Sequence, residues 1–316
     1  MLNIKKEIMI HSFKKITPKI IRNLIRHIRR NWRKTKRKAR LRYLQYKFPN
    51  GHISICNDAE IFVNYSDKNS YWYDGDSDSL KDELEYFVSL FNLRKPSVII
   101  DVGAHWGFYP AFLDKYCNSA KANIEHLICI EPDPKNLFCL KNTVNRVQNF
   151  DVSIIEKAVS NTSNVVNFYR EGGQDCGHIQ HTQNSKYACK VDAATLSEII
   201  SKIDMSDKQV THIKVDIDGY EPAFFEGAAD VLKKYNPLML IEFYAKGIES
   251  AGYDLGKYWN FLITNYNVYE IGHEKKVGML ELFHDDLPYL QEKTMDIPGK
   301  GHITNLILLP RGKYVV

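Results

Sequence analysis

The stretch of residues 97–107, SVIIDVGAHWG, constrains the fold of this chain most strongly. Its largely apolar run follows Pro96 and ends at Gly103, a pattern typical of a strand buried on both faces in a parallel sheet. Gly103 lets the backbone turn without a Cβ, and Gly107 opens a helix whose first N–H groups can bind a carboxylate or phosphate. The stretch therefore predicts a strand, a ligand-binding turn and a helix.

A second apolar run, Leu127–Ile130, ends in Glu131 at the distance that one strand-helix-strand unit requires. An acid at this place can bind the ribose hydroxyls of a dinucleotide or of S-adenosylmethionine. A dinucleotide needs Gly-x-Gly-x-x-Gly for its pyrophosphate, whereas His105 and Trp106 crowd the place of the second glycine. S-adenosylmethionine has no phosphate and fits this loop better. The alternative is a tight turn that binds no ligand.

Apolar periodicity continues to alternate between helix and strand along the chain. It predicts helices over residues 108–116, 136–147, 196–203, 224–235 and 255–265, and strands over residues 152–155, 212–217, 238–243, 267–271 and 303–309. This alternation favours a parallel doubly wound sheet, closed by a final antiparallel strand. Upstream, a hairpin around Asn57 and a helix over residues 80–91 are expected.

Four segments resemble the FkbM-type methyltransferases, which use S-adenosylmethionine and mostly methylate hydroxyl groups, often on glycans. The matching segments are 101–107, 130–132, 158–160 and 213–221, within roughly residues 96–269. The resemblance implies a Rossmann-like class I methyltransferase fold, with a mostly parallel seven-stranded sheet and helices on both faces. It also implies a cofactor site formed by Asp101, Gly103, Ala104, His105, Gly107, Glu131 and Ala158. His105 replaces the family's usual Asn, and Asp218 its usual Glu.

Methyl transfer to a hydroxyl requires alignment of the acceptor and removal of its proton. Asp216 and Asp218 lie at the end of the predicted strand 212–217, where residues two apart share a face, with Lys214 before them. Together with Glu242 they are the candidate bases, assisted by an imidazole from His178 or His181 in a Gly-rich loop that we expect to act as a lid. A divalent metal held by the acids is left open, as is a solvated acidic turn with no catalytic role.

The charge is distributed unevenly: residues 1–48 carry a balance of +16 and residues 49–316 one of −11. We therefore expect three parts: a basic helical arm over 1–48, a small cap or substrate region over 49–95, and the methyltransferase domain over 96–316. In the arm, apolar residues including Ile21, Ile25 and Trp32 recur at helical spacing among arginines. Such a helix can bind an anionic membrane surface or nucleic acid, or pack on its own acidic domain.

No apolar run approaches the roughly 18 residues that a membrane span needs. The six cysteines form no Cys-x-x-Cys pair, which favours buried free thiols in a reducing compartment. We therefore expect a cytoplasmic protein, peripheral on a membrane if the arm binds lipid. The expected function is O-methylation of a hydroxyl-bearing acceptor, favouring a sugar or glycan. The alternatives are RNA methylation and a non-catalytic binding protein on a methyltransferase fold.

Overall fold

The computed structural model describes residues 35, 38–55, 59–65, 87–88, 90, 97–120, 123–170, 177–179, 188–205, 207–271, 279–294 and 304–311. The chain divides into two units, residues 1–50 and 51–316. In the first unit, residues 38–47 form a helix on which Tyr43 and Tyr46 are exposed. The arm helix expected from residue 17 and most of the helix expected over 80–91 lie outside the described residues.

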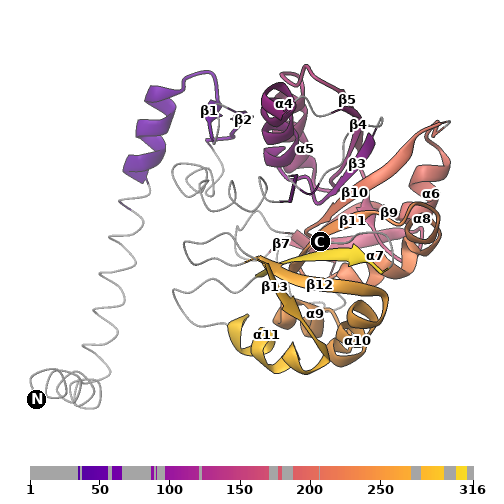
Figure 1. Cartoon of the computed structure of the whole chain (residues 1–316). Helices are drawn as coiled ribbons and strands as arrows, with labels where there is room; N and C mark the ends of the chain where they lie inside the picture. The colour runs from indigo at the N-terminus through magenta and orange to yellow at the C-terminus, as the bar shows by residue number, and fades with distance from the viewer. Residues whose placement is uncertain are drawn as a thin grey trace, which may run out of the picture. The chain divides into compact units, whose positions relative to one another are not determined.

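A large sheet forms the centre of the second unit (Figure 1). Its strand order is β13-β12-β14-β11-β10-β3-β4-β5. The bounds are β3 (Ser97–Val102), β4 (Ile124–Ile130), β5 (Asp151–Ile155), β10 (Gln209–Val215), β11 (Leu238–Phe243), β12 (Tyr266–Ile271), β13 (Met279–Leu282) and β14 (Thr304–Pro310). Strands β11, β10, β3, β4 and β5 are parallel, and β14 runs antiparallel to both β11 and β12.

The predicted doubly wound fold is confirmed, but the sheet has eight strands and not seven. The additional strand is β13, which pairs antiparallel with β12 at the edge of the sheet. This strand is short and only its last residue, Leu282, is buried. Its sequence therefore lacks the buried apolar run that identified the central strands.

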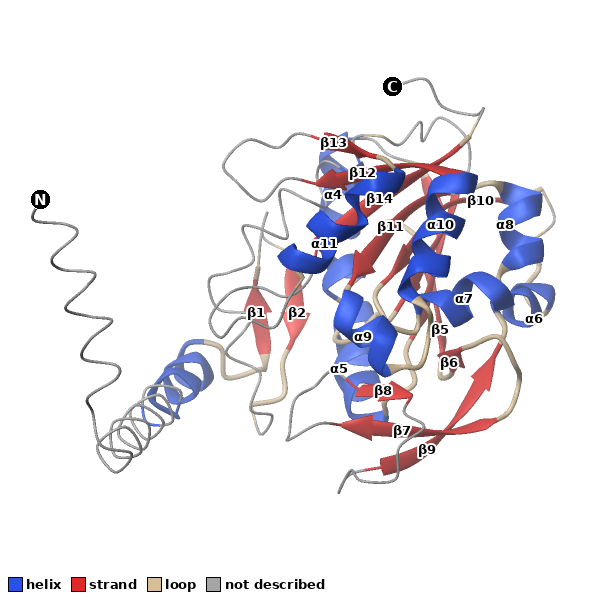
Figure 2. Cartoon of the chain, turned by 90° about the horizontal axis from the view of Figure 1, so that it is seen from below, coloured by secondary structure: helices blue, strands red, loops and turns tan. Residues whose placement is uncertain are grey.

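Helices cover both faces of the sheet (Figure 2). One face packs against α4 (Phe108–Ala120) and α5 (Pro134–Val144), and the other against α6 (Leu196–Ser201), α7 (Glu221–Gly227), α8 (Ala229–Tyr235) and α10 (Leu255–Asn265). The single helix expected over 224–235 is in fact α7 and α8. The backbone changes direction at Ala228, where Gly227 packs so closely that a Cβ would lie 2.1 Å from the Ser160 carbonyl oxygen.

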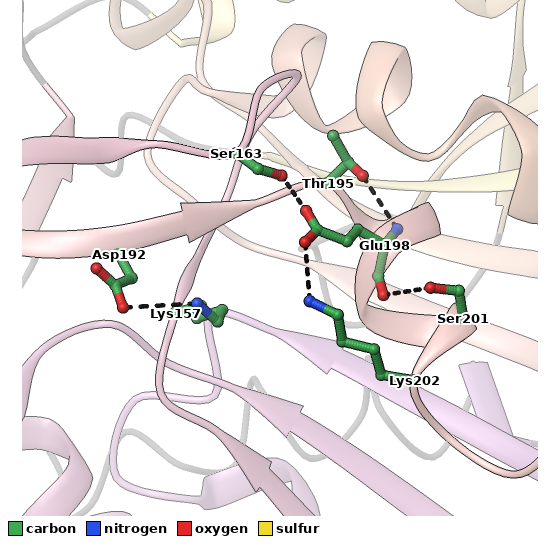
Figure 3. A network of polar contacts seen from close by, with 7 residues as sticks. All are labelled: Lys157, Ser163, Asp192, Thr195, Glu198, Ser201 and Lys202. Atoms are coloured by element: carbon green, nitrogen blue, oxygen red, sulfur yellow. Dashed lines mark hydrogen bonds and ion pairs between the residues drawn. The ribbon is translucent and has the colours of Figure 1, made fainter.

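A smaller sheet follows β5. It has the order β6-β9-β7-β8, with β6 (Ala158–Val159), β7 (Val165–Arg170), β8 (Gly177–Ile179) and β9 (Ala188–Ala194). Figure 3 shows how polar contacts join it to α6: the Ser163 hydroxyl donates to the Glu198 carboxylate, which also pairs with Lys202 at 2.8 Å. Lys157 pairs with Asp192 of β9 at 3.6 Å. The Ser163–Glu198 contact therefore joins the segment before β7 to α6, and the Lys157–Asp192 pair joins the residue before β6 to β9.

The remaining described elements are short. The expected hairpin is confirmed as β1 (His52–Ser54) and β2 (Glu60–Phe62), and α9 (Ala245–Ser250), a 3-10 helix at His284–Asp286 and α11 (Leu287–Lys293) complete the unit. The Phe62 N–H donates to the Thr143 hydroxyl of α5 at 2.9 Å, which ties the hairpin to the helix. None of the described helices is both long and apolar enough to span a membrane. The four cysteines within the described residues are free thiols.

Candidate functional site

The turn between β3 and α4 is built from left-handed residues. Gly103, His105 and Gly107 have φ values of +83°, +50° and +87°. The N–H groups of Gly103 and Ala104 both donate to the Ile130 carbonyl of the neighbouring strand β4, at 2.9 and 3.1 Å. A Cβ on Gly103 would lie only 1.9 Å from the backbone oxygen of Asp216, so only glycine fits this position. The turn predicted as the cofactor loop thus lies directly against the end of β10.

The Glu131 carboxylate organises this turn. Its Oε2 accepts the N–H of His105 at 2.9 Å, and its Oε1 accepts the N–H of Asp133 at 2.9 Å and the side-chain amide of Asn136 at 3.2 Å. Asn136 in turn accepts the indole N–H of Trp106 at 3.0 Å. Because a carboxylate offers about four acceptor positions, three protein donors leave room for about one more. Burial raises the pKa of Glu131 to about 7.

Asp101 and Lys214 form a buried ion pair inside the sheet. The two residues are register partners in β3 and β10, and Lys214 Nζ lies 3.1 Å from Asp101 Oδ1. The same ammonium group lies 3.4 Å from the carbonyl oxygen of Gly103 and 3.4 Å from Asp216 Oδ2. Lys214 thus pairs with Asp101 inside the sheet and with Asp216 beyond the end of its own strand. Lys214 connects the cofactor turn to the end of β10.

Asp216 and Asp218 lie beyond β10, which ends at Val215. The alternation argument that placed both aspartates on one strand face is therefore wrong, because Asp218 lies in a turn with φ +55°. The two carboxyl groups are nevertheless close enough to interact, since burial and then the charge of Asp216 raise the pKa of Asp218 to about 7. The Asp216 side chain is 43% exposed and is the more accessible to an acceptor.

Glu242 lies next to the end of the adjacent strand β11, as expected, and belongs to the same group of acids. Burial raises its pKa well above the usual range for a glutamate, and the charges of Asp216 and Asp218 and a side-chain hydrogen bond with Asp216 raise it further. The raised pKa favours the protonated form of Glu242, whose carboxyl group hydrogen-bonds the Asp216 side chain. In contrast, the charge of the Lys214 ammonium lowers the pKa of Asp101 and of Asp218 and so opposes the effect of burial on them.

The other predicted site residues lie elsewhere or are only partly described. His178 belongs to β8, where it pairs with Tyr169, so this residue is in a strand and not in the loop that was expected. His181 and residues 171–176 of that loop lie outside the described residues. Ala158 packs in a separate apolar cluster with Phe168, Val191 and Ala193. The roles predicted for these residues stay predictions.

The polar groups of the site fit S-adenosylmethionine better than a metal. Glu131 retains acceptor capacity for a ribose hydroxyl, and Asp101 Oδ2 is a buried oxygen without a hydrogen-bond partner, which suits a cationic donor such as the amino group of the cofactor. The residues therefore fit this cofactor. Among the described residues, no group of three or more His, Cys, Asp or Glu has the arrangement needed to hold a metal ion.

Two residues of the site were not identified as site residues from the sequence. Asn136 hydrogen-bonds both Trp106 and Glu131. The sequence feature that could have identified it is a polar residue in the first turn of the helix that follows Glu131. Glu221 is a fully buried acid that accepts a hydrogen bond from the N–H of Ile217 at 3.2 Å. It belongs to the segment 213–221 that carried the family resemblance.

The model of the methyltransferase FkbM domain matches residues 101–271, which is more than half of the chain. No functionally curated protein sequence matches the chain.

Several solved structures are similar at low identity. Methyltransferase FkbM from Methylobacillus flagellatus is 19% identical with a TM-score of 0.40, and the alignment covers 78% of this chain and 56% of that one. An rRNA methylase from Streptococcus thermophilus is 8% identical with a TM-score of 0.39, covering 73% and 96%. A candidate methyltransferase from Streptococcus mutans in complex with SAH is 10% identical with a TM-score of 0.38, covering 73% and 96%. Likeness at this level carries no conclusion about substrate.

Proposed function

This chain belongs to the family of FkbM methyltransferases, and from that premise we propose that it transfers the methyl group of S-adenosylmethionine to a hydroxyl group of a carbohydrate acceptor. The observation that carries the proposal is the position of Asp216. Its backbone oxygen lies against Gly103 of the cofactor turn, and its exposed carboxylate is held by Lys214. The side chain that we propose as the base thus lies beside the turn that we propose to bind the cofactor.

When bound, S-adenosylmethionine supplies a methyl carbon that is already activated by the sulfonium. The turn 103–107, Glu131 and Asp101 would hold it. The Asp216 carboxylate, with Asp218 beside it, would accept the acceptor's hydroxyl proton as the O–CH₃ bond forms and the S–CH₃ bond breaks. Lys214 Nζ lies 3.4 Å from the Asp216 carboxylate and Glu242 hydrogen-bonds it, so these two side chains would orient it. The base in this scheme acts without a metal ion.

The first experiment is calorimetric titration of S-adenosylmethionine into the wild-type protein and Glu131→Gln. The substitution replaces one carboxylate oxygen with an NH₂ group, which would place a donor against a backbone N–H that is itself a donor. Binding is therefore expected to weaken roughly tenfold or more. Glu156→Gln is the matched control, because Glu156 follows β5 as Glu131 follows β4 but forms only an exposed pair with Lys141. Absence of binding by the wild type contradicts the proposal.

The second experiment identifies the acceptor class. Methyl-labelled S-adenosylmethionine is incubated with the enzyme and separately with methyl glycosides, lipid-linked glycans and RNA. We expect label in carbohydrate, and a loss of about 100-fold or more in Asp216→Asn. Asp285→Asn, an exposed position on the 3-10 helix, is the control. Label in RNA alone favours the alternative enzyme, and cofactor binding without transfer to any acceptor favours a non-catalytic protein.

We further propose that the basic arm holds the enzyme on an anionic membrane surface, at its cytoplasmic side. The described helix over 38–47 supports this, because it has basic residues and no acid, and its Tyr43 and Tyr46 are 54% and 86% exposed. Tyrosines and basic residues suit the headgroup region of a membrane. Co-sedimentation with phosphatidylserine vesicles tests this. Binding is expected to require residues 1–48 and to weaken with salt, whereas preferential binding of RNA contradicts it.

A further inference from the structure

Glu221 is a buried acid whose hydrogen bonds all lead to one turn. Its side chain has no solvent exposure, although acids are seldom fully buried without partners. The backbone N–H groups of Ile217 and Gly219, and its own N–H, donate to its carboxyl group, with a distance of 3.2 Å from Ile217 N to Oε1. These donors come from the turn that presents Asp216 and Asp218. The carboxyl group therefore closes this turn from inside the protein.

The same turn is in close backbone contact on two further sides. On one side, Gly103 of the cofactor turn lies against the carbonyl oxygen of Asp216. On the other side, a Cβ on Gly219 would lie 2.3 Å from the backbone carbon of Gly247 in α9, and Gly219 has a φ of +101°. Little freedom remains for the backbone between these contacts. Asp218 is consequently held in the left-handed region, which is costly for residues other than glycine.

We infer that Glu221 is a positioning residue: its buried carboxyl group sets the conformation of the 216–219 turn and thereby directs the Asp216 and Asp218 carboxyl groups toward the acceptor. The catalytic meaning of this inference rests on the proposed function. The conformational part does not, because it concerns hydrogen bonds within the chain alone. The two parts can therefore be tested separately.

The alternative is that Glu221 only fills space at the start of α7. One physical argument and one observation disfavour this alternative. The argument is that a leucine or methionine would fill an apolar site without the cost of burying a carboxyl group. In addition, Glu221 Oε2 has no hydrogen-bond partner in the structure, so the side chain retains a buried unpaired atom while Oε1 is engaged by the turn. The arrangement is costly in stability, which is typical of a residue kept for positioning.

The charged groups around Glu221 determine which substitutions are informative. Burial raises the pKa of Glu221 to about 8, and the charge of Asp218 contributes to this shift. Asp216, Glu242 and Lys214 belong to the same group of interacting charges. The carboxyl group is thus protonated at neutral pH, and glutamine reproduces both its shape and its neutral charge. Methionine has a similar length but no acceptor, so Glu221→Gln and Glu221→Met form a matched pair.

The experiment is hydrogen exchange of the segment 209–221, followed by mass spectrometry, in the full chain without cofactor or acceptor. Glu221→Gln is expected to keep the wild-type protection, and Glu221→Met is expected to lose protection in this segment by at least tenfold while other segments stay unchanged. Carbon-13 labelling of the aspartate carboxyls supplies a second readout. The pKa of Asp218 is expected to stay near 7 in Glu221→Gln and to fall in Glu221→Met, as the loosened turn becomes solvated.

Equal protection in all three proteins overturns the inference, as does equal loss in both variants. If Glu221→Met does not fold, Glu221→Asp replaces it. That variant keeps an acid but is one methylene too short to reach the Ile217 N–H, and it is expected to lose the same protection. Titration with S-adenosylmethionine completes the set: the affinity of Glu221→Gln, which keeps the turn, is expected to stay within about threefold of wild type. A wild type that binds no cofactor overturns the proposed function and leaves the exchange result interpretable.

Discussion

Lys214 Nζ lies 3.1 Å from Asp101 Oδ1, between two residues that face each other directly in adjacent parallel strands. Asp101 is completely buried, and the Lys214 side chain is only 17% exposed. Burial raises the pKa of Asp101, and Lys214 counteracts this shift. The ammonium also bonds the Gly103 carbonyl, so one lysine links the interior of the sheet to the cofactor turn.

Lys214→Met is expected to destabilise the protein by about 3–5 kcal/mol, because it leaves the Asp101 carboxyl buried without its partner. The double variant Lys214→Met with Asp101→Asn should recover part of this loss, since it removes the uncompensated charge. Urea denaturation of the two single variants and the double variant measures the coupling. Strictly additive effects would contradict a pair interaction.

Gly103→Ala is expected to impair both stability and cofactor binding. A Cβ there meets the Asp216 carbonyl oxygen at 1.9 Å, and Gly103 has a φ of +83°. Gly252 is the matched control, because its φ is +88° but nothing lies within 4 Å of an added Cβ. Gly252→Ala should cost only the left-handed penalty of about 1–2 kcal/mol. Gly103→Ala should cost roughly 1–3 kcal/mol more, from overlap. Equal melting temperatures for the two variants would refute the close contact.

The affinity for S-adenosylmethionine is expected to rise with pH up to about 7 and to level off above it. Burial raises the pKa of Glu131 to about 7, and the ionised carboxylate is the better acceptor for a ribose hydroxyl. The expected gain is up to about tenfold per pH unit, because one proton is released on binding. Calorimetry at several pH values in buffers of different ionisation enthalpy checks this. The pH dependence should be absent in Glu131→Gln.

Glu221→Gln is expected to change how stability depends on pH. The folded-state pKa of Glu221 is about 8 against an ordinary value of 4.5, so the folded protein binds this proton more tightly than the unfolded chain. The resulting stabilisation is complete below pH 4.5 and is lost as pH rises toward 8, at no more than about 1.4 kcal/mol per pH unit. The free energy of unfolding of Glu221→Gln relative to wild type should therefore increase from about pH 5 to pH 8. If urea unfolding gave the same pH dependence of the free energy of unfolding for both proteins, the raised pKa of Glu221 would be contradicted.

Much of the fold could be predicted from local sequence. Val98, Ile99 and Ile100 are buried between two helical layers, and apolar runs with no polar face are diagnostic of such strands. The helix over 255–265 was predicted with its observed bounds, and in the structure the Asp254 side chain caps its first turn. Strand β13 was missed because its residues are mostly exposed and form no apolar run. Only its pairing with β12, which the local sequence does not encode, makes it a strand.

The candidate site was predicted in part. Glu131 and the glycines of the turn were identified because they lie within one strand-helix-strand unit. Their spacing can therefore be recognised from a short stretch of sequence. The grouping of Asp216 with Asp218 was also found, but for a wrong reason, since a turn and not a strand brings them together. Glu221 was missed because a glutamate at a helix start is ordinarily a solvated residue that interacts favourably with the helix dipole.

The sequence by itself determined the order of the central strands and most of their flanking helices, the two glycines of the cofactor turn and the acids that follow β4 and β10. These depend on backbone conformation and on burial periodicity, which neighbouring residues encode. Only the tertiary structure decided that Lys214 pairs with Asp101, that Gly103 contacts Asp216 and that Glu221 closes the 216–219 turn. The pairing of Lys214 and the contact of Gly103 each join residues far apart in the sequence, through the register of β3 against β10. The hydrogen bond from Ile217 to Glu221 joins residues only four apart in the sequence. It nevertheless depends on the burial of the Glu221 carboxyl group, and that burial results from packing of the core.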